Sequence, residues 1–167
     1  MKTIPVQNSD RVIWCDDEDF ERLSKYKWWF TNKTVVITKF PRNKSVSIAR
    51  IVMCRKVMFD HIDRNPFNNC KSNLRECSIA QNAWNKSKLA RTTSKYKGVH
   101  WAKANKKWKA KIVFLGKRIH LGYFDIEEDA ARAYDAAACK LFLEFANLNF
   151  PPVKGENATQ SLPVQQT

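Results

Sequence analysis

The order of apolar and polar positions along the chain divides it into three parts, and the first part predicts strands. Apolar and β-branched runs over 12–14, 27–30 and 34–38 favour extended structure. Residues 16–23 lie between the first two runs and begin with acidic side chains, which a short helix prefers at its positive N-terminal end. We therefore expect residues 1–56 to form a β-rich region that contacts the partner identified below.

The second part, residues 57–90, is rich in asparagine and in turn-forming residues. The expected elements in chain order are a strand over 57–59, a loop over 63–73, a return strand over 74–77 and a helix over 79–89. Ser78 and Gln81 have the spacing of a capping box, in which each side chain bonds the backbone of the other. The pattern predicts a strand–loop–strand–helix unit.

The third part predicts a small sheet with one apolar face and one basic face. Strands are expected over 95–101, 106–114 and 117–124, with turns between them. Alternate residues of a strand point to opposite faces. The apolar set of the middle strand is Trp108, Ala110, Ile112 and Phe114, and the opposite set is Lys107, Lys109, Lys111 and Val113.

A helix that follows this sheet is expected to cover its apolar face. The helix runs over 127–142, and Asp125 with Glu128 has the spacing of a capping box. Its predicted apolar stripe is Ala130, Ala133, Tyr134, Ala137 and Leu141. The predicted fold class is α+β, with a β-rich region over 1–56, a ββα core over 57–90, a three-stranded antiparallel sheet packed on one helix over 94–150, and a disordered tail over 151–167.

Charge points to a polyanionic partner. The chain of 167 residues has 30 Lys and Arg against 16 Asp and Glu, a formal net charge of +14, and residues 91–125 hold ten of the basic residues against one acid. Such clustering is typical of nucleic-acid binding. No apolar stretch reaches the roughly 18–20 residues that span a bilayer. We expect double-stranded DNA as the partner, no membrane, and no obligate protein partner.

The cysteines exclude two classes of small domain. The five cysteines are odd in number and none forms a C-x-x-C pair, so neither a zinc ribbon nor a disulfide framework is indicated. Cys70 and Cys77 are interpreted as packing residues. No Walker-type or dinucleotide-binding glycine pattern is present. These features favour an intracellular protein with reduced thiols, located in the cytoplasm, and in a bacterial host cytoplasm if a phage encodes it.

The asparagine-rich unit carries candidate chemistry. Asp60 and Asn82 offer an oxygen pair that suits a hard divalent cation, Mg²⁺ first and Mn²⁺ as the alternative. His61 beside them has a near-neutral pKa and could take a proton from water. The combination indicates phosphodiester hydrolysis. Arg75 could contact the scissile phosphate or brace the loop, and Asn85 is expected to be a solvated helix position.

These residues resemble the HNH (ββα-metal) nucleases, especially phage homing endonucleases, over about 35 residues. The resemblance rests on Asp60-His61, on Asn73 twelve residues after His61, and on Asn82 nine residues further. It implies that Asp60 and Asn82 are metal ligands, that His61 is the general base, and that Asn73 holds the loop and orients His61. It also implies a homing-type endonuclease whose products carry 5′-phosphate and 3′-hydroxyl ends, and a monomer with one site is expected to nick.

The basic sheet and its helix resemble the AP2/ERF DNA-binding domain over about 55 residues. The matching strings are Tyr96-Lys97-Gly98-Val99, Trp108-Lys109-Ala110-Lys111-Ile112, Leu121-Gly122-Tyr123-Phe124 and the alanine-rich run over 130–138. The resemblance implies that the groove-facing residues are Lys97, His100, Lys111, Arg118 and His120. Lysine supplies point charges instead of bidentate guanine contacts, so a GC-rich preference is not expected to carry over.

Two other hypotheses fit part of the sequence. A non-catalytic DNA-binding regulator that kept a degenerate nuclease fold explains the charge and cuts nothing. An RNA-binding protein explains the charge and leaves the nuclease residues without a role. The complete set of Asp60, His61, Asn73 and Asn82 favours the enzyme.

Overall fold

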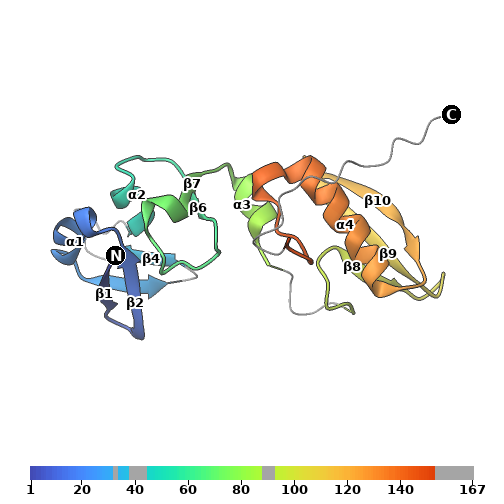
Figure 1. Cartoon of the computed structure of the whole chain (residues 1–167), viewed down its shortest axis with the longest axis horizontal. Helices are drawn as coiled ribbons and strands as arrows, with labels where there is room; N and C mark the ends of the chain where they lie inside the picture. Colours follow the sequence, from blue (N-terminus) through green and yellow to red (C-terminus); the bar gives the residue numbers. More distant parts are fainter. Residues whose placement is uncertain (32–33, 38–44, 88–92, 153–167) are drawn as a thin grey trace.

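A computed structural model describes residues 1–31, 34–37, 45–87 and 93–152. Figure 1 shows two lobes with helix α3 between them, the N-terminal strands on one side and the C-terminal sheet and helix on the other. The mixture of sheets and helices confirms the predicted α+β class. The described part of the chain holds no helix that is long and apolar enough to cross a membrane.

The N-terminal lobe is built on a five-stranded sheet of order β2-β1-β3-β4-β5. Its elements are β1 (Lys2–Val6), β2 (Ser9–Cys15), α1 (Asp17–Ser24), β3 (Trp28–Thr31), β4 (Thr34–Ile37), β5 (Val46–Ser47) and α2 (Ile48–Val52). The predicted strands and the short acidic helix are all present, while residue 38 at the end of one predicted strand lies outside the described ranges. Trp28, Ile13 and Leu23 are fully buried and form the centre of this core.

A two-stranded hairpin follows and joins the same core. Its strands are β6 (Phe59–His61) and β7 (Leu74–Glu76), which are antiparallel, and a 3₁₀ turn, η1 (Lys71–Asn73), leads into β7. The hairpin begins later than predicted, so Asp60 and His61 lie within β6. Phe67 from the intervening loop and Leu74 pack into the N-terminal core, and this packing holds the loop against the first lobe.

Helix α3 (Ile79–Asn85) begins as the sequence predicts. Ser78 accepts a hydrogen bond from the Gln81 backbone and Gln81 accepts one from the Ser78 backbone, so the predicted capping box is confirmed. The helix ends at Asn85, before the predicted end at residue 89, because Lys86 already has an extended backbone, and residues 88 and 89 fall outside the described ranges. The Trp84 ring stacks on Phe142 with centroids 4.7 Å apart and on Phe114 at 5.4 Å. The helix is therefore anchored to the C-terminal lobe.

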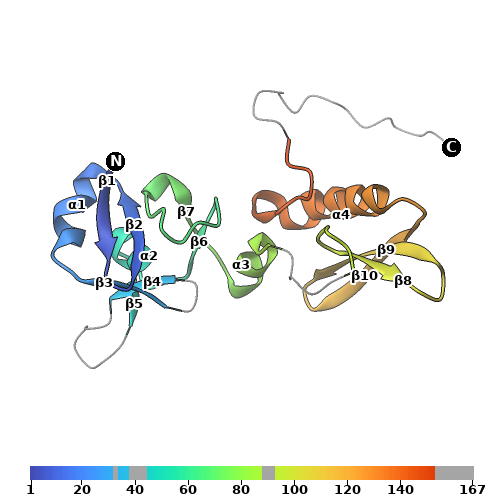
Figure 2. The ribbon, with the colours of Figure 1, turned by 90° about the horizontal axis from the view of Figure 1, so that it is seen from below.

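The C-terminal lobe is a three-stranded antiparallel sheet of order β10-β9-β8 packed on one long helix (Figure 2). Its elements are β8 (Val99–Ala102), β9 (Lys107–Phe114), β10 (Lys117–Phe124), α4 (Glu127–Phe142) and the 3₁₀ turn η2 (Leu143–Phe145). Small side chains bring helix and sheet close together, since Ala130, Ala131 and Ala138 are fully buried. Gly98 is required for this approach, because a Cβ there would lie 2.0 Å from the Tyr134 ring.

One local prediction for α4 is wrong, and another is confirmed in part. Ile126 is the N-cap, without a side-chain cap bond. The two acids of the predicted capping box are drawn to tertiary partners instead: Asp125 pairs with Lys107, and Glu128 accepts a hydrogen bond from the Tyr96 hydroxyl. Of the predicted apolar stripe, Ala130 and Tyr134 are buried, and Ala133, Ala137 and Leu141 are partly buried against the core. The buried face also includes Ala131, Ala138 and Phe142.

Candidate functional site

Asp60 lies where β6, β7 and α3 meet, and its carboxylate is 5 % exposed. It is the cross-strand partner of Arg75. The Arg75 Nε and Nη2 atoms donate to Asp60 Oδ2 at 3.0 and 2.8 Å. Asn85 Nδ2 donates to Oδ1 at 3.1 Å and to Oδ2 at 2.9 Å. Three elements therefore converge on one buried carboxylate.

The amide that contacts Asp60 comes from Asn85, one helical turn after Asn82. Asn85 is also 5 % exposed, and its Nδ2 donates to the His61 carbonyl oxygen at 2.9 Å. The expectation that Asn85 is solvated is therefore wrong. Asn82 is half-buried, and its Nδ2 lies 3.7 Å from the sulfur of Met58, two residues before Asp60. The signal in the sequence was the three-residue spacing, which puts Asn82 and Asn85 on one face of the helix.

His61 is held by a residue that the sequence analysis did not select. Its Nε2 lies 3.1 Å from Oδ1 of Asn69, a residue with no exposed surface. Asn69 Nδ2 donates to the Pro66 carbonyl, and this bond directs Oδ1 toward the imidazole. Burial lowers the pKa of His61, against the opposing effects of the Asn69 bond and of the Asp63 and Asp60 charges. The ring is therefore neutral at neutral pH.

Asn73 makes hydrogen bonds within the loop between β6 and β7. Its Nδ2 donates to Asp63 Oδ1 and to the Asn68 carbonyl, each at 2.8 Å, and its Oδ1 accepts from the Asp63 backbone at 3.0 Å. These bonds account for its burial in a polar loop. The hydrogen bond to the His61 ring is made by Asn69, so any effect of Asn73 on His61 is transmitted through the loop.

Arg75 reaches from the hairpin to the C-terminal lobe. Besides its bonds to Asp60, its Nη1 donates to the Glu144 carbonyl oxygen, and its guanidinium lies 3.9 Å from the centre of the Phe145 ring. Its side chain is only 13 % exposed. The structure shows Arg75 bracing the hairpin against η2, and its contact with the scissile phosphate stays a prediction.

That basic face is formed by β8, β9 and β10. Cross-strand pairing places His100 opposite Lys109 and His120 opposite Lys111 on one face, with Arg118 opposite Val113 on the same side. Lys107 also lies on this side, and its Nζ is 3.1 Å from an Asp125 carboxylate oxygen. Burial and the charges of the neighbouring lysines and of His120 lower the pKa of His100.

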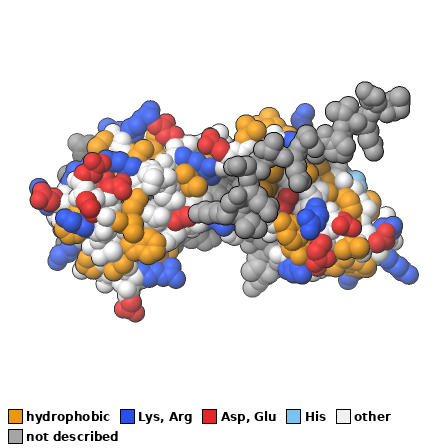
Figure 3. All heavy atoms as spheres, in the orientation of Figure 1, with side chains coloured by type: hydrophobic (Ala, Val, Ile, Leu, Met, Phe, Trp, Pro, Cys, Tyr) orange, Lys and Arg blue, Asp and Glu red, His pale blue; other side chains and the backbone are white. Residues whose placement is uncertain are grey.

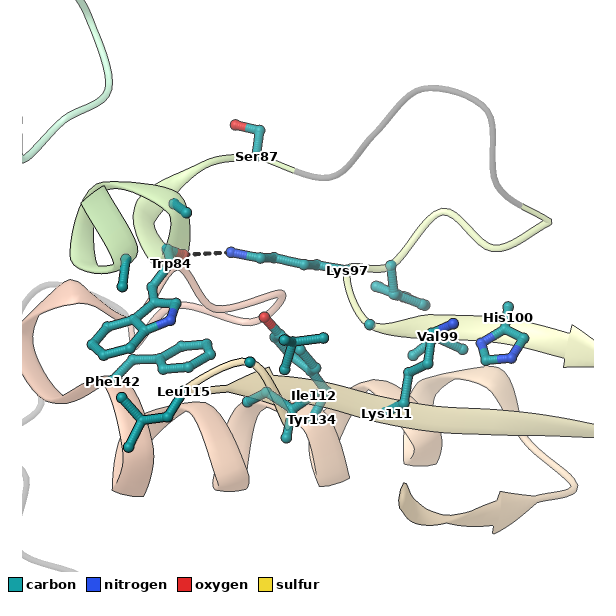
Figure 4. A pocket seen from close by; sticks show the side chains of 16 residues that line it. Trp84, Ser87, Lys97, Val99, His100, Lys111, Ile112, Leu115, Tyr134 and Phe142 are labelled. Carbon is teal, nitrogen blue, oxygen red and sulfur yellow. Dashed lines mark hydrogen bonds between the residues drawn. The ribbon is translucent and has the colours of Figure 1, made fainter. Parts of the chain in front are cut away.

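Lys97 departs from its expected place. Its Nζ donates to the Trp84 carbonyl oxygen at 2.5 Å, as Figure 4 shows, and burial lowers its pKa to about 8. It lies beside a cavity of about 520 Å³ between α3 and the sheet. The predicted groove-facing role for Lys97 is therefore not supported by its position: the residue precedes β8, and its backbone N–H is held at 2.6 Å by Asn149.

Comparison with known proteins identifies the family. No family model matches the chain. The chain is 34 % identical over 133 residues to the "Uncharacterized HNH endonuclease L560" of Acanthamoeba polyphaga mimivirus, which covers 76 % of this chain and 68 % of that protein. The chain belongs to the HNH endonuclease family. The chain is also 35 % identical over 75 residues to "Protein 3.8" of Escherichia phage T7, covering 45 % of the chain and 62 % of that protein.

The chain is also similar to plant proteins with APETALA2 or AP2 in their names. It is 41 % identical over 58 residues to the "APETALA2-like protein 2" of Oryza sativa subsp. japonica, covering 35 % of the chain and 13 % of that protein. It is 44 % identical over 62 residues to the "AP2/ERF and B3 domain-containing transcription factor RAV1" of Arabidopsis thaliana, covering 37 % and 18 %. The combination of an HNH nuclease with an AP2-like segment is thus confirmed.

The oxygen donors around Asp60 are of the type that a hard cation prefers. The Asp60 carboxylate lies among amide groups from α3, and among the described residues no group of three or more His, Cys, Asp or Glu could hold a metal. Mg²⁺ is commonly bound by one or two carboxylates with waters and substrate phosphates, which makes a single buried carboxylate with nearby amides a fitting site. Asp60 and Asn82 are the residues that could supply its protein ligands, because Asn85 directs its Nδ2 donor, and not its oxygen, toward Asp60.

Proposed function

We propose that this HNH endonuclease is a metal-dependent, homing-type DNA endonuclease that hydrolyses a phosphodiester bond and nicks one strand as a monomer. The observation that supports this most is the buried Asp60 carboxylate, which receives the Asn85 amide from α3 and is followed in the chain by His61, whose imidazole is kept neutral by burial. A proton acceptor and a hard-cation site on adjacent residues are the two components that such hydrolysis requires.

In this proposal His61 takes the proton from the attacking water through Nδ1. Asn69 Nδ2 is committed to the Pro66 carbonyl, so Asn69 presents its oxygen to the imidazole. An oxygen acceptor requires that Nε2 carries the ring proton, which leaves the lone pair on Nδ1. Asn69 thereby fixes both the tautomer and the ring orientation. The base is neutral because burial disfavours the charged form.

We assign Asp60 as the carboxylate ligand of one divalent ion, Mg²⁺ or Mn²⁺. Oδ2 receives both Arg75 donors and the shorter of the Asn85 contacts, whereas Oδ1 receives the longer Asn85 contact alone, so Oδ1 is the oxygen better placed to bind a cation. Asn82 and Asn85 supply the amide face beside it. When bound, the ion offsets the charge that builds up on the phosphate and the leaving oxygen.

The basic face of β8–β10 is proposed to bind double-stranded DNA. Lys109, Lys111 and Arg118 stand on the sheet face opposite the one on which α4 packs (Figure 2). A sheet can enter the major groove. Similarity to AP2 segments of proteins named as transcription factors supports the same partner. In the view of Figure 3, acidic and basic side chains are interspersed over both lobes.

One observation favours the alternative of a non-catalytic DNA-binding regulator. Both oxygens of Asp60 already have protein donors, from Arg75 and Asn85, and a degenerate nuclease would keep such an internally satisfied carboxylate. The alternative predicts normal DNA binding without any cutting, and the lysines of the sheet serve it equally well.

Plasmid nicking separates the two functions. Supercoiled plasmid is incubated with the full chain and Mg²⁺, with EDTA in a parallel reaction, and with the His61→Ala variant. The proposal expects open-circular product that disappears with EDTA and falls by several orders of magnitude in the variant, with DNA binding nearly unchanged. Absence of product at saturating protein, or undiminished nicking by His61→Ala, contradicts it.

A further inference from the structure

The charge of Asp60 is neutralised before any cation arrives. Asp60 forms an ion pair with Arg75, whose Nε and Nη2 both donate to Oδ2. The nearby Asp63 carboxylate accepts hydrogen bonds from Asn65, Asn68 and Asn73 within the loop. The opposite charges of Asp60 and Arg75 therefore cancel. Arg75 competes with a divalent cation for the Asp60 carboxylate.

Arg75 is held in this position from a second side. The Glu144 carbonyl accepts from Nη1, and the Phe145 ring lies against the guanidinium at 3.9 Å. Both residues belong to η2 of the C-terminal lobe, and Phe145 is itself buried. The guanidinium is thus clamped between the hairpin that carries Asp60 and the lobe that carries the basic sheet face.

We propose that Arg75 is a positioning residue that makes divalent-cation binding at Asp60 conditional on DNA. A divalent cation at Asp60 brings two positive charges next to a buried guanidinium, where repulsion is only weakly screened. A DNA phosphate supplies the missing negative charge, and the planar guanidinium fork matches a phosphate as well as a carboxylate. Arg75 thus pairs with the Asp60 carboxylate when DNA is absent and with a DNA phosphate when DNA is bound. This inference rests on the proposed nuclease function.

Thermodynamic linkage makes the effect measurable without cleavage. If DNA tightens cation binding by some factor, the cation tightens DNA binding by the same factor. A variant that lacks the guanidinium charge no longer repels the cation, so it binds the cation more tightly than the wild type when DNA is absent. For the same reason, the addition of DNA raises its cation affinity by a smaller factor. A residue with only a structural role would not tighten cation binding when it is removed.

The test measures Mn²⁺ binding to the full chain by electron paramagnetic resonance, with and without a short phosphorothioate duplex at low salt. Arg75→Gln is compared with Arg55→Gln, a matched control because Arg55 pairs with Glu76, the residue after Arg75, and makes no ion pair with Asp60. The Asp60→Asn variant is measured with the duplex as a second control, because the Mn²⁺ still bound in that sample is held by the duplex and not by the protein site. We expect the duplex to tighten Mn²⁺ binding by the wild type by about tenfold or more.

Without DNA, we expect Arg75→Gln to bind Mn²⁺ about tenfold more tightly than the wild type, and Arg55→Gln to bind as the wild type does. Equal or weaker binding by Arg75→Gln overturns the proposal. If that variant does not fold, the wild type alone decides, because absence of a duplex effect also overturns it. The double variant Asp60→Asn, Arg75→Gln separates the two failures. If it binds Mn²⁺ as tightly as Arg75→Gln alone, Asp60 is not the metal ligand, and the proposed function fails.

Discussion

Replacement of Asn85 by alanine tests whether this buried amide supports the site. The Asn85→Ala variant loses the donor that contacts both Asp60 oxygens and the His61 carbonyl, all within a region with little solvent access. Hydrogen bonds to charged groups contribute about 1.5–3 kcal/mol, and a buried acceptor left without its donor adds a desolvation cost. We therefore expect the free energy of unfolding to fall by about 2–3 kcal/mol.

Asn82→Ala is the matched control, because it removes the same group one helical turn earlier. The Nδ2 of Asn82 contacts the Met58 sulfur, a weak acceptor, so its loss should cost less than about 1 kcal/mol. Urea unfolding of both variants gives the comparison. As a proposed metal ligand, Asn82 should instead affect plasmid nicking, with the fold nearly intact. Equal destabilisation by the two substitutions would refute the reasoning that Asn85 has the supporting role.

Three further predictions concern packing, pH and DNA affinity. Gly98→Ala should cost more than about 3 kcal/mol in urea unfolding, because the new Cβ meets the Tyr134 ring at a positive φ, whereas Gly116→Ala has open space and should cost about 1 kcal/mol. The pKa of His61 is lowered from 6.5, so the acid limb of the nicking rate should have its midpoint below pH 6.5. The contribution of the neutral His61 ring to folding stability is complete above pH 6.5 and is lost as the pH falls from 6.5 toward the lower pKa of the folded state. A midpoint of the nicking rate above pH 6.5 would contradict this prediction. Lys111→Ala should weaken DNA binding and reduce the slope of log affinity against log salt by about one, measured by fluorescence anisotropy.

The sequence was most informative where structure depends on neighbouring residues. The capping box of Ser78 and Gln81 forms as its spacing predicts, because both partners lie within one helical turn. The alternation along β9 also predicted which side chains are buried, since Ala110 and Ile112 are buried and Lys111 is exposed. Local geometry alone is enough to determine such features.

Features that depend on distant partners could not be predicted. Asp125 has the spacing of a helix cap, yet its carboxylate accepts a hydrogen bond from Lys107 at the start of β9. Arg75 was assigned to the loop or to phosphate because its contact with Phe145, seventy residues later, has no local signature. Asn69 was one asparagine among several, and only its burial beside the imidazole separates it from the others.

Helix α3 links chemistry and DNA binding through two consecutive residues. Trp84 packs between Phe114 and Phe142 in the C-terminal lobe, and Asn85 is directed to Asp60 in the hairpin. Any shift of the helix along or around its axis moves both side chains together, since they share one rigid backbone segment. The AP2-like lobe therefore supports the proposed nuclease site in addition to its proposed role in DNA binding. The aromatic stack at Trp84 holds the amide of Asn85 against the Asp60 carboxylate.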